Sequence, residues 1–207
     1  MNKLILIILL LTSAAQAATK VDVVAAVGPN GFTCEQTLKM FRDSLYAYDA
    51  IGVKFKIIKE SCMINPYPGD LDNRFTNWFK WSKKLKHRKR KTIVITNPLH
   101  DGGLTWIAGL GSYPMQLAIV YAQPKNTNGD DRYYMSMTAT QHETGHVKGA
   151  DHDEAPDQIM HPNALFYTLT NPDLKFSSQS IKEFKSWRAR KKYWGRARRF
   201  EVLTAIN

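Results

Sequence analysis

The chain has 207 residues, of which 43% are hydrophobic, and a formal net charge of +11 at pH 7. This size and composition suit one domain with a good core, and no repeat, low-complexity linker or second domain is evident. Beyond residue 17 no segment is long and apolar enough to cross a bilayer, which excludes a helical membrane span. The excess of positive charge is unusual for a plain digestive enzyme.

Residues 1–17 have the pattern of a secretory signal peptide. Lys3 gives a charged start, Leu4 to Leu11 form a short apolar run, and Ala15 and Ala17 are the small residues that a signal peptidase inspects. We therefore expect cleavage after Ala17 and a soluble mature protein that is secreted or periplasmic. An uncleaved anchor is the alternative.

Strand and helix patterns alternate in the first half of the chain. We expect strands at 21–27, 53–59 and 92–96, and helices at 33–50 and 71–87. This order favours a mostly parallel sheet with right-handed crossovers. Two further strands are expected at 102–108 and 116–122.

Cys34 and Cys62 are the two cysteines of the chain. An even pair in an exported protein favours a disulfide, which would stabilise the fold by roughly 3–4 kcal/mol. Buried free thiols are the alternative.

Residues 142–152 carry the pattern His-Glu-x-x-His-x-x-Gly-x-x-His. On a helix, His142 and His146 lie one turn apart, so both imidazoles leave the same face and can bind one zinc ion. Gly149 can end the helix in the left-handed conformation, and the resulting turn could bring in His152 as the third ligand. Glu143 lies off that line and suits a proton acceptor. The helix is expected to start between residues 131 and 138, although a longer helix is allowed. The alternative to a zinc site is a helix end that is rich in histidine by chance.

Met160 follows His152 by eight positions, and together with the motif it resembles the Met-turn of the metzincin zinc endopeptidases. The short spacing and the Met-x-Pro ending are similar to the matrixin branch, whereas Asp153 is similar to the adamalysin branch. The resemblance implies an α+β zincin fold with a mixed, mostly parallel sheet, an antiparallel edge strand, a zinc helix, a Met-turn and a C-terminal helix at 178–197. It also implies one catalytic domain at 18–207, divided into subdomains at 18–152 and 153–207.

The same resemblance implies a zinc-dependent endopeptidase that binds one catalytic Zn²⁺ through the three histidines and uses Glu143 as the general base. The strand at 116–122 is in the right order to be the edge that pairs with an extended peptide through Leu117, Ala118 and Ile119, although an interior strand is the alternative. Residues 162–172 would line a substrate pocket, with Pro162 and Tyr167 as candidate contacts. Asp153 is expected to orient the turn by hydrogen bonds, and His161 lies either toward the cleft or on the surface.

Basic residues are concentrated in two runs, from Lys83 to Lys91 and from Arg188 to Arg199. Such runs indicate an anionic partner, such as nucleic acid, lipopolysaccharide, a sulfated glycan or an anionic membrane surface, or else a solvated face. An exported basic binding protein with a structural or vestigial zinc site is therefore the rival to a peptidase. Residues 126–131 offer oxygen ligands for calcium, but their spacing matches no strong template, and a polar turn is favoured. We expect a monomer.

Overall fold

The fold is described from a computed structural model that covers residues 17–28, 32–67, 71–84, 90–96, 109–113, 116–122, 129–164, 168 and 173–186, with backbone alone for 71–75 and 129–132. The predictions of a signal peptide, of a strand at 102–108, of Tyr167 as a substrate contact and of the run from Arg188 to Arg199 lie outside these residues. Of the polar turn expected at 126–131, residues 126–128 lie outside them, and 129–131 are helical instead. Within them, no helix is long and apolar enough to span a membrane.

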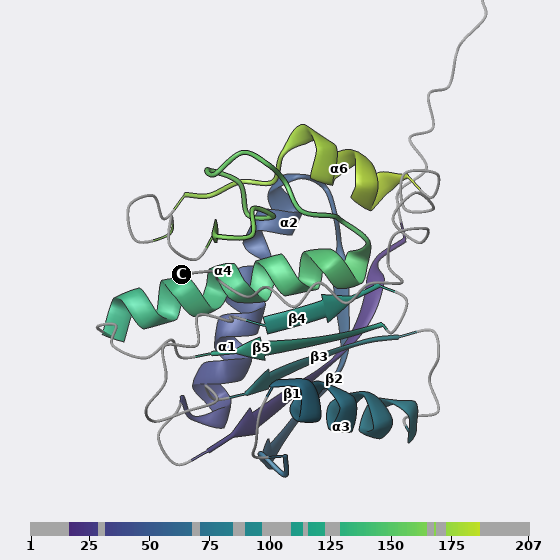
Figure 1. Ribbon diagram of the computed structural model, residues 1–207, viewed down its shortest axis with the longest axis vertical. Helices are drawn as coiled ribbons and strands as arrows, with labels where there is room; N and C mark the ends of the chain where they lie inside the picture. Colours follow the sequence, from purple (N-terminus) through teal and green to yellow (C-terminus); the bar gives the residue numbers. More distant parts are fainter. Residues whose placement is uncertain are drawn as a thin grey trace, which may run out of the picture.

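A five-stranded sheet of order β2-β1-β3-β5-β4 forms the centre of the molecule (Figure 1). Four strands run parallel, namely β1 (Thr19–Val27), β2 (Phe55–Ile64), β3 (Lys91–Thr96) and β5 (Leu117–Tyr121). The short β4 (Gly109–Ser112) is antiparallel to β5 at one edge. The predicted mixed, mostly parallel sheet with an antiparallel edge strand is thus confirmed.

The edge strand itself is not the one that the sequence suggested. We expected 116–122 at the edge, but β5 is hydrogen-bonded to β3 on one side and to β4 on the other. Leu117, Ala118 and Ile119 are completely buried, because helices cover both faces of the sheet at this point. These three residues therefore do not lie along an open edge, and the prediction that they do is wrong.

The predicted helix at 33–50 is two helices, α1 (Cys34–Ser44) and α2 (Tyr46–Ala50), separated at Leu45. Thr33 and Gln36 form a reciprocal capping box at the start of α1. At its end, the Leu45 N–H bonds to the carbonyl of Arg42 at 3.2 Å, three residues back, and the Ser44 hydroxyl donates to the carbonyl of Phe41 at 2.6 Å. This tighter turn ends the first helix, which periodicity alone did not reveal.

The helices cover the two faces of the sheet. α3 (Leu71–Lys84) lies on one face and buries Trp78 against β1, β3 and β5. α1 and α4 (Gly129–Lys148) lie on the other face, where their apolar side chains pack on the same strands. A third cluster joins α2, the segment 150–176 and the short α6 (Ser178–Lys185). α4 consequently lies between the sheet and the segment that follows it (Figure 1).

The predicted disulfide between Cys34 and Cys62 is present, and it ties the first residue of α1 to β2 across 28 residues. α4 begins at Gly129, earlier than the expected start between residues 131 and 138. Thr138 is therefore buried within the helix and receives a hydrogen bond from the Thr168 hydroxyl at 2.9 Å. α3 is described as far as Lys84, and the rest of the predicted range to 87 lies outside the described residues. α6 ends at Lys185 because Ser186 is extended, so the single helix expected at 178–197 is wrong. Nothing tests the division into subdomains at 152, which stays a prediction.

Candidate metal centre

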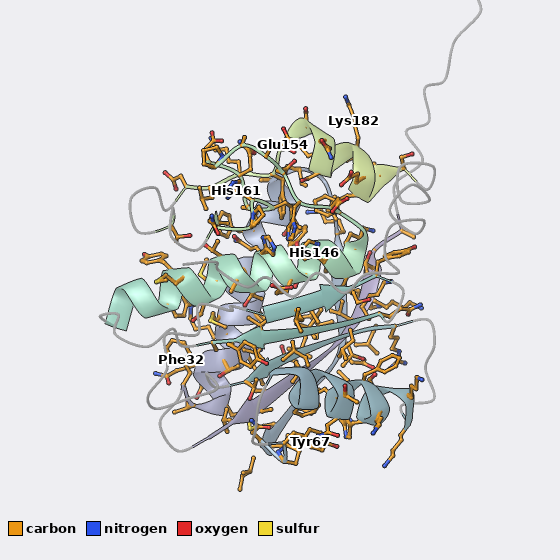
Figure 2. The ribbon with its side chains drawn as sticks, in the orientation of Figure 1. Phe32, Tyr67, His146, Glu154, His161 and Lys182 are labelled. Atoms are coloured by element: carbon orange, nitrogen blue, oxygen red, sulfur yellow. A yellow bond between two sulfur atoms is a disulfide. The ribbon has the colours of Figure 1, made fainter. Side chains whose placement is uncertain are left out.

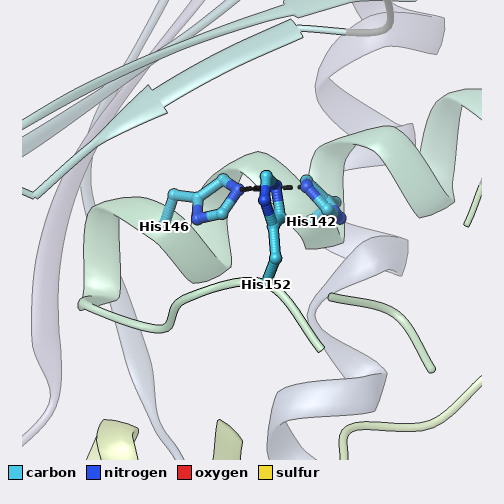
Figure 3. Close-up of side chains that lie close together, drawn as sticks. All are labelled: His142, His146 and His152. Atoms are coloured by element: carbon cyan, nitrogen blue, oxygen red, sulfur yellow. Dashed lines mark hydrogen bonds between the residues drawn. The ribbon is translucent and has the colours of Figure 1, made fainter. Parts of the chain in front are cut away.

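The structure brings His142, His146 and His152 together at the end of α4 (Figure 3). The Nε2 atom of His146 lies 3.0 Å from Nε2 of His142 and 3.0 Å from Nε2 of His152. Three nitrogens bound tetrahedrally to one zinc ion, with Zn–N bonds of about 2.0–2.1 Å, lie roughly 3.3 Å apart. The three rings therefore converge at nearly the spacing that a single metal ion needs.

The outer nitrogens of two of these rings are bonded to backbone carbonyls. Nδ1 of His142 lies 2.7 Å from the carbonyl of Ile159, and Nδ1 of His146 lies 2.9 Å from that of Ala150. Because a carbonyl only accepts, each Nδ1 carries the proton and each Nε2 presents a lone pair to the centre. Burial lowers the pKa of His142 to about 3 and the pKa of His146 well below its usual value, so both rings are neutral near pH 7. A set of converging lone pairs without protons between them suits a cation.

The turn after α4 brings in the third histidine. Gly149 has φ = +108°, a left-handed conformation that a side chain would strain, so the helix ends at Lys148 as predicted from the sequence. The N–H of Asp151 then donates to the carboxylate of Glu183 on α6 at 2.9 Å. His152 follows directly, so α6 holds the backbone that carries this ligand.

Asp153 fixes the other side of the same turn. Its carboxylate is buried and accepts hydrogen bonds from the hydroxyls of Ser177 at 2.7 Å and Ser180 at 2.6 Å, at the start of α6. Its N–H donates to the carbonyl of Met160 at 3.0 Å. The expected structural role of Asp153 in orienting the turn is consistent with these bonds.

Met160 is completely buried beneath the zinc-motif helix. A Cβ added to Gly145 would lie 3.1 Å from Cε of Met160 and closer still to its sulfur, and 3.4 Å from the hydroxyl of Tyr48. Tyr48 in turn donates a hydrogen bond to the carbonyl of Gln141 from inside the third core cluster. Because Gly145 has no side chain, the thioether can pack directly against the backbone between His142 and His146.

Glu143 points to the opposite side of α4, toward the edge strand. A Cβ on Gly109 would lie 2.6 Å from Cγ of Glu143, and a Cβ on Gly111 would lie 3.1 Å from its Oε2 and 2.7 Å from Cβ of His146. Burial raises the pKa of Glu143 to about 8. The two glycines thus allow β4 to lie directly on the carboxylate, which is confined between the helix and the strand.

Sequence reasoning missed this contribution of Gly109 and Gly111. Glycines at alternate positions of a strand face the same side and often indicate the close approach of another backbone, so the sequence Gly-Leu-Gly carried the signal. Two other candidates lie on the segment beyond α4: Pro162 is exposed, and His161 is half-buried with Nδ1 accepting from the Asn163 N–H at 3.0 Å (Figure 2).

Solved structures similar to this one include those of an archaemetzincin, a zinc-dependent peptidase and a metalloproteinase. Archaemetzincin from Methanopyrus kandleri aligns with a TM-score of 0.52 and 16% identity, covering 92% of this chain and 100% of that one. A zinc-dependent peptidase from Methanocorpusculum labreanum aligns with a TM-score of 0.51 and 16% identity over 79% and 99% of the two chains. Metalloproteinase-II from Bacteroides fragilis gives 0.50 and 13% over 82% of this chain and 52% of that one.

No protein-family model matches the sequence, and no curated protein matches it either. At such low identity the structural likeness establishes the fold alone. The chain therefore has a fold similar to that of archaemetzincin, a mixed α+β architecture built on the five-stranded sheet described above. The predicted likeness to zinc proteases is confirmed at this level, whereas the matrixin-like and adamalysin-like details stay predictions.

Proposed function

We propose that the protein is a zinc-dependent endopeptidase of the metzincin type, with one catalytic zinc ion held by His142, His146 and His152. The observation that carries the proposal is the convergence of the three Nε2 atoms, two of them with Nδ1 bonded to a backbone carbonyl. The similarity of the fold to zinc-dependent peptidases supports it. Met160 would be the methionine of the Met-turn, packed below the ligands against Gly145.

Zinc bound by three neutral imidazoles supplies Lewis acidity, which polarises a carbonyl group and acidifies water. The residues of the chain provide the rest of the chemistry. Glu143 follows the first ligand directly and holds its carboxylate between α4 and β4. Burial alone would keep this group protonated near pH 7, but the charge of a bound zinc ion would lower its pKa, so that it could take a proton from the attacking water and pass it to the leaving amine. Its burial keeps competing water away from that transfer.

The substrate would bind as an extended peptide along β4. This strand is the last of the sheet in the described part of the chain, and its backbone lies directly over Glu143. A peptide that adds one more strand is held through main-chain hydrogen bonds, which tolerate many sequences. Pro162 is exposed on the segment that passes the other side of the histidines and remains a candidate substrate contact.

Export from the cytoplasm is part of the proposal. The signal-peptide pattern at residues 1–17 supports it, and so does the disulfide between Cys34 and Cys62, because such bonds persist mainly in oxidising compartments. We propose a secreted or periplasmic protein that acts as a monomer on proteins or peptides.

The test compares Glu143→Gln with Glu154→Gln in the purified mature protein. Each change removes one carboxylate of the motif segment, but Glu143 is buried next to the first ligand in sequence, whereas Glu154 is exposed (Figure 2). Zinc content and hydrolysis of a proteome-derived peptide library are measured for both variants and the parent. We expect Glu143→Gln to retain one zinc ion per chain and to lose activity by a factor of about 10²–10⁴, with Glu154→Gln close to the parent.

Two results would contradict the proposal. A parent protein that binds no zinc would remove the metal centre, and a Glu143→Gln variant that cleaves at the parent rate would remove the general base. A parent that binds zinc but hydrolyses no peptide of the library would favour the basic binding protein with a structural zinc site.

A further inference from the structure

The fold gathers basic side chains from four elements at the end of the sheet where the parallel strands begin. Lys20 on β1 is paired in register with Lys56 on β2, and Lys59 is paired with Asp22 one step further along. Lys91 is the first residue of β3 and is paired with Val21 of β1. α3 connects β2 to β3 and ends with Lys83 and Lys84, so its last turn lies at the same end of the sheet.

All of these side chains except that of Lys91 also lie on the same face, because Lys91, like Ile93 and Ile95 of the same strand, projects to the α1 and α4 side. Val21 and Val23 pack on the α1 and α4 side, and Val24 packs on the α3 side. Because strand residues alternate, Lys20 and its partner Lys56 project to the α3 side. Lys59 lies three residues after Lys56 and would face the other side in a regular strand, but the irregularity in register between Val21 and Asp22 turns it to the α3 side as well. We call this surface the basic face, and it comprises Lys20, Lys56, Lys59, Lys83 and Lys84.

Little negative charge compensates the basic face. Asp22 is 5% exposed and lies 3.4 Å from Arg90, so it is already paired. Glu60 lies on the opposite face of the sheet, where it binds Arg42 of α1 at 2.7 Å. Among the described side chains of β1, β2, α3 and β3 these are the two acidic ones. Lys20, Lys56, Lys59, Lys83 and Lys84 are all exposed.

We propose that the basic face binds an anionic membrane surface. The charges of the basic face are spread across two strands and a helix end, and all of them are lysines. A lysine ammonium on its flexible stem suits diffuse contact with lipid headgroups, whereas the planar guanidinium of arginine suits specific bonds to bases and single phosphates. An aromatic ring lies beside the charges, since Nζ of Lys83 is 4.3 Å from the ring centre of Phe79. Phe side chains accompany lysines and arginines on helices that lie in the headgroup interface.

The position of the basic face leaves the metal centre accessible. α3 and α4 lie on opposite faces of the sheet, so a protein bound to a membrane through the α3 side directs the histidines away from it. In Figure 2, Tyr67, which packs on Trp78 of α3, lies at the end of the molecule opposite to Lys182 of α6. Membrane binding and peptide hydrolysis therefore use separate surfaces.

The test compares the charge reversals Lys56→Glu/Lys59→Glu and Lys182→Glu/Lys185→Glu. All four lysines are exposed, and each double variant changes the net charge equally, but the second pair lies on α6. Binding is measured by sedimentation with vesicles of phosphatidylcholine and phosphatidylserine. Vesicles of phosphatidylcholine alone test the need for negative charge, duplex DNA tests the alternative partner, and a soluble peptide substrate measures hydrolysis. Glu143→Gln is included because it should bind vesicles like the parent whether or not the proposed hydrolysis exists.

We expect Lys56→Glu/Lys59→Glu to bind the anionic vesicles at least ~30-fold more weakly, since each lysine near such a surface contributes about fivefold to the affinity. The α6 pair should change binding by less than about threefold, because charges beyond a Debye length of roughly 10 Å are screened. Hydrolysis of the soluble peptide should be unchanged in both. Equal loss of vesicle binding in the two double variants would overturn the proposal, as would a parent protein that binds duplex DNA but not the anionic vesicles.

Discussion

Replacing Gly145 by alanine separates what the sequence predicts from what the packing requires. In the middle of a helix, alanine is favoured over glycine by about 1 kcal/mol, so sequence reasoning predicts a more stable protein. In the structure the new Cβ would lie 3.1 Å from Cε of Met160 and closer still to its sulfur, and Met160 is completely buried. Overpacking of this kind costs typically 1–3 kcal/mol. Because Met160 is completely buried in the core, we expect the cost to exceed the gain, with a net loss of up to about 2 kcal/mol.

The decisive measurement is a double-mutant cycle by urea denaturation at fixed zinc concentration, with the parent, Gly145→Ala, Met160→Ala and the double variant. Met160→Ala removes the atoms that the new methyl group would meet. In that background Gly145→Ala should therefore stabilise the protein by up to about 1 kcal/mol, the helix-propensity gain alone. The coupling energy equals the overpacking cost, about 1–3 kcal/mol. If Gly145→Ala has the same effect in both backgrounds, or stabilises the parent, the reasoning from close packing is refuted.

Three further predictions follow from contacts around the site. Gly111→Ala should lower peptide hydrolysis by a factor of about 10² with zinc retained, because a 1 Å displacement of the strand over Glu143 is enough for such a loss. The control Ser112→Ala, on the same strand, should cleave like the parent. Equal rates for the two variants would contradict this prediction. Asp153→Ala should reduce the free energy of unfolding by about 3 kcal/mol, since it removes two hydrogen bonds to a charged acceptor. It should also weaken zinc binding, measured by competition with a chelator. An unchanged zinc affinity would show that the turn is held in another way. Replacing both cysteines by serine should lower the free energy of unfolding, measured by urea denaturation, by about 3–4 kcal/mol, because the disulfide closes a loop of 28 residues. A loss below about 1 kcal/mol would mean that the unfolded chain without the disulfide retains structure there.

Local signals of the sequence predicted most of the elements and the cluster of three histidines well. The β-branched runs that became β1 and β3, the spacing of His142 and His146, and Gly149 at the helix end all act within a few residues, so their physical meaning does not depend on the rest of the fold. The single disulfide was predictable because two cysteines allow one intramolecular pairing.

The parts that failed depend on contacts that the hydrophobic pattern of a single segment does not contain. Whether Leu117 to Tyr121 form an edge or an interior strand is decided by β4, whose short sequence has two glycines and no strand pattern. The separation of α1 from α2 at Leu45 is decided by side-chain bonds within one turn and by the burial of Tyr48 in a different cluster. Periodicity contains neither kind of information.

The bond between His142 and the carbonyl of Ile159 has a thermodynamic consequence. The two residues are 17 positions apart, and the N–H of Ile159 bonds in turn to the carbonyl of Lys175 at 2.9 Å. An unfolded chain cannot reproduce this arrangement, so zinc would bind the folded state almost alone. Each tenfold rise in free zinc above its dissociation constant should then add about 1.4 kcal/mol to the stability of the protein. The ambient supply of the metal would thus decide how long each molecule survives unfolding and proteolysis.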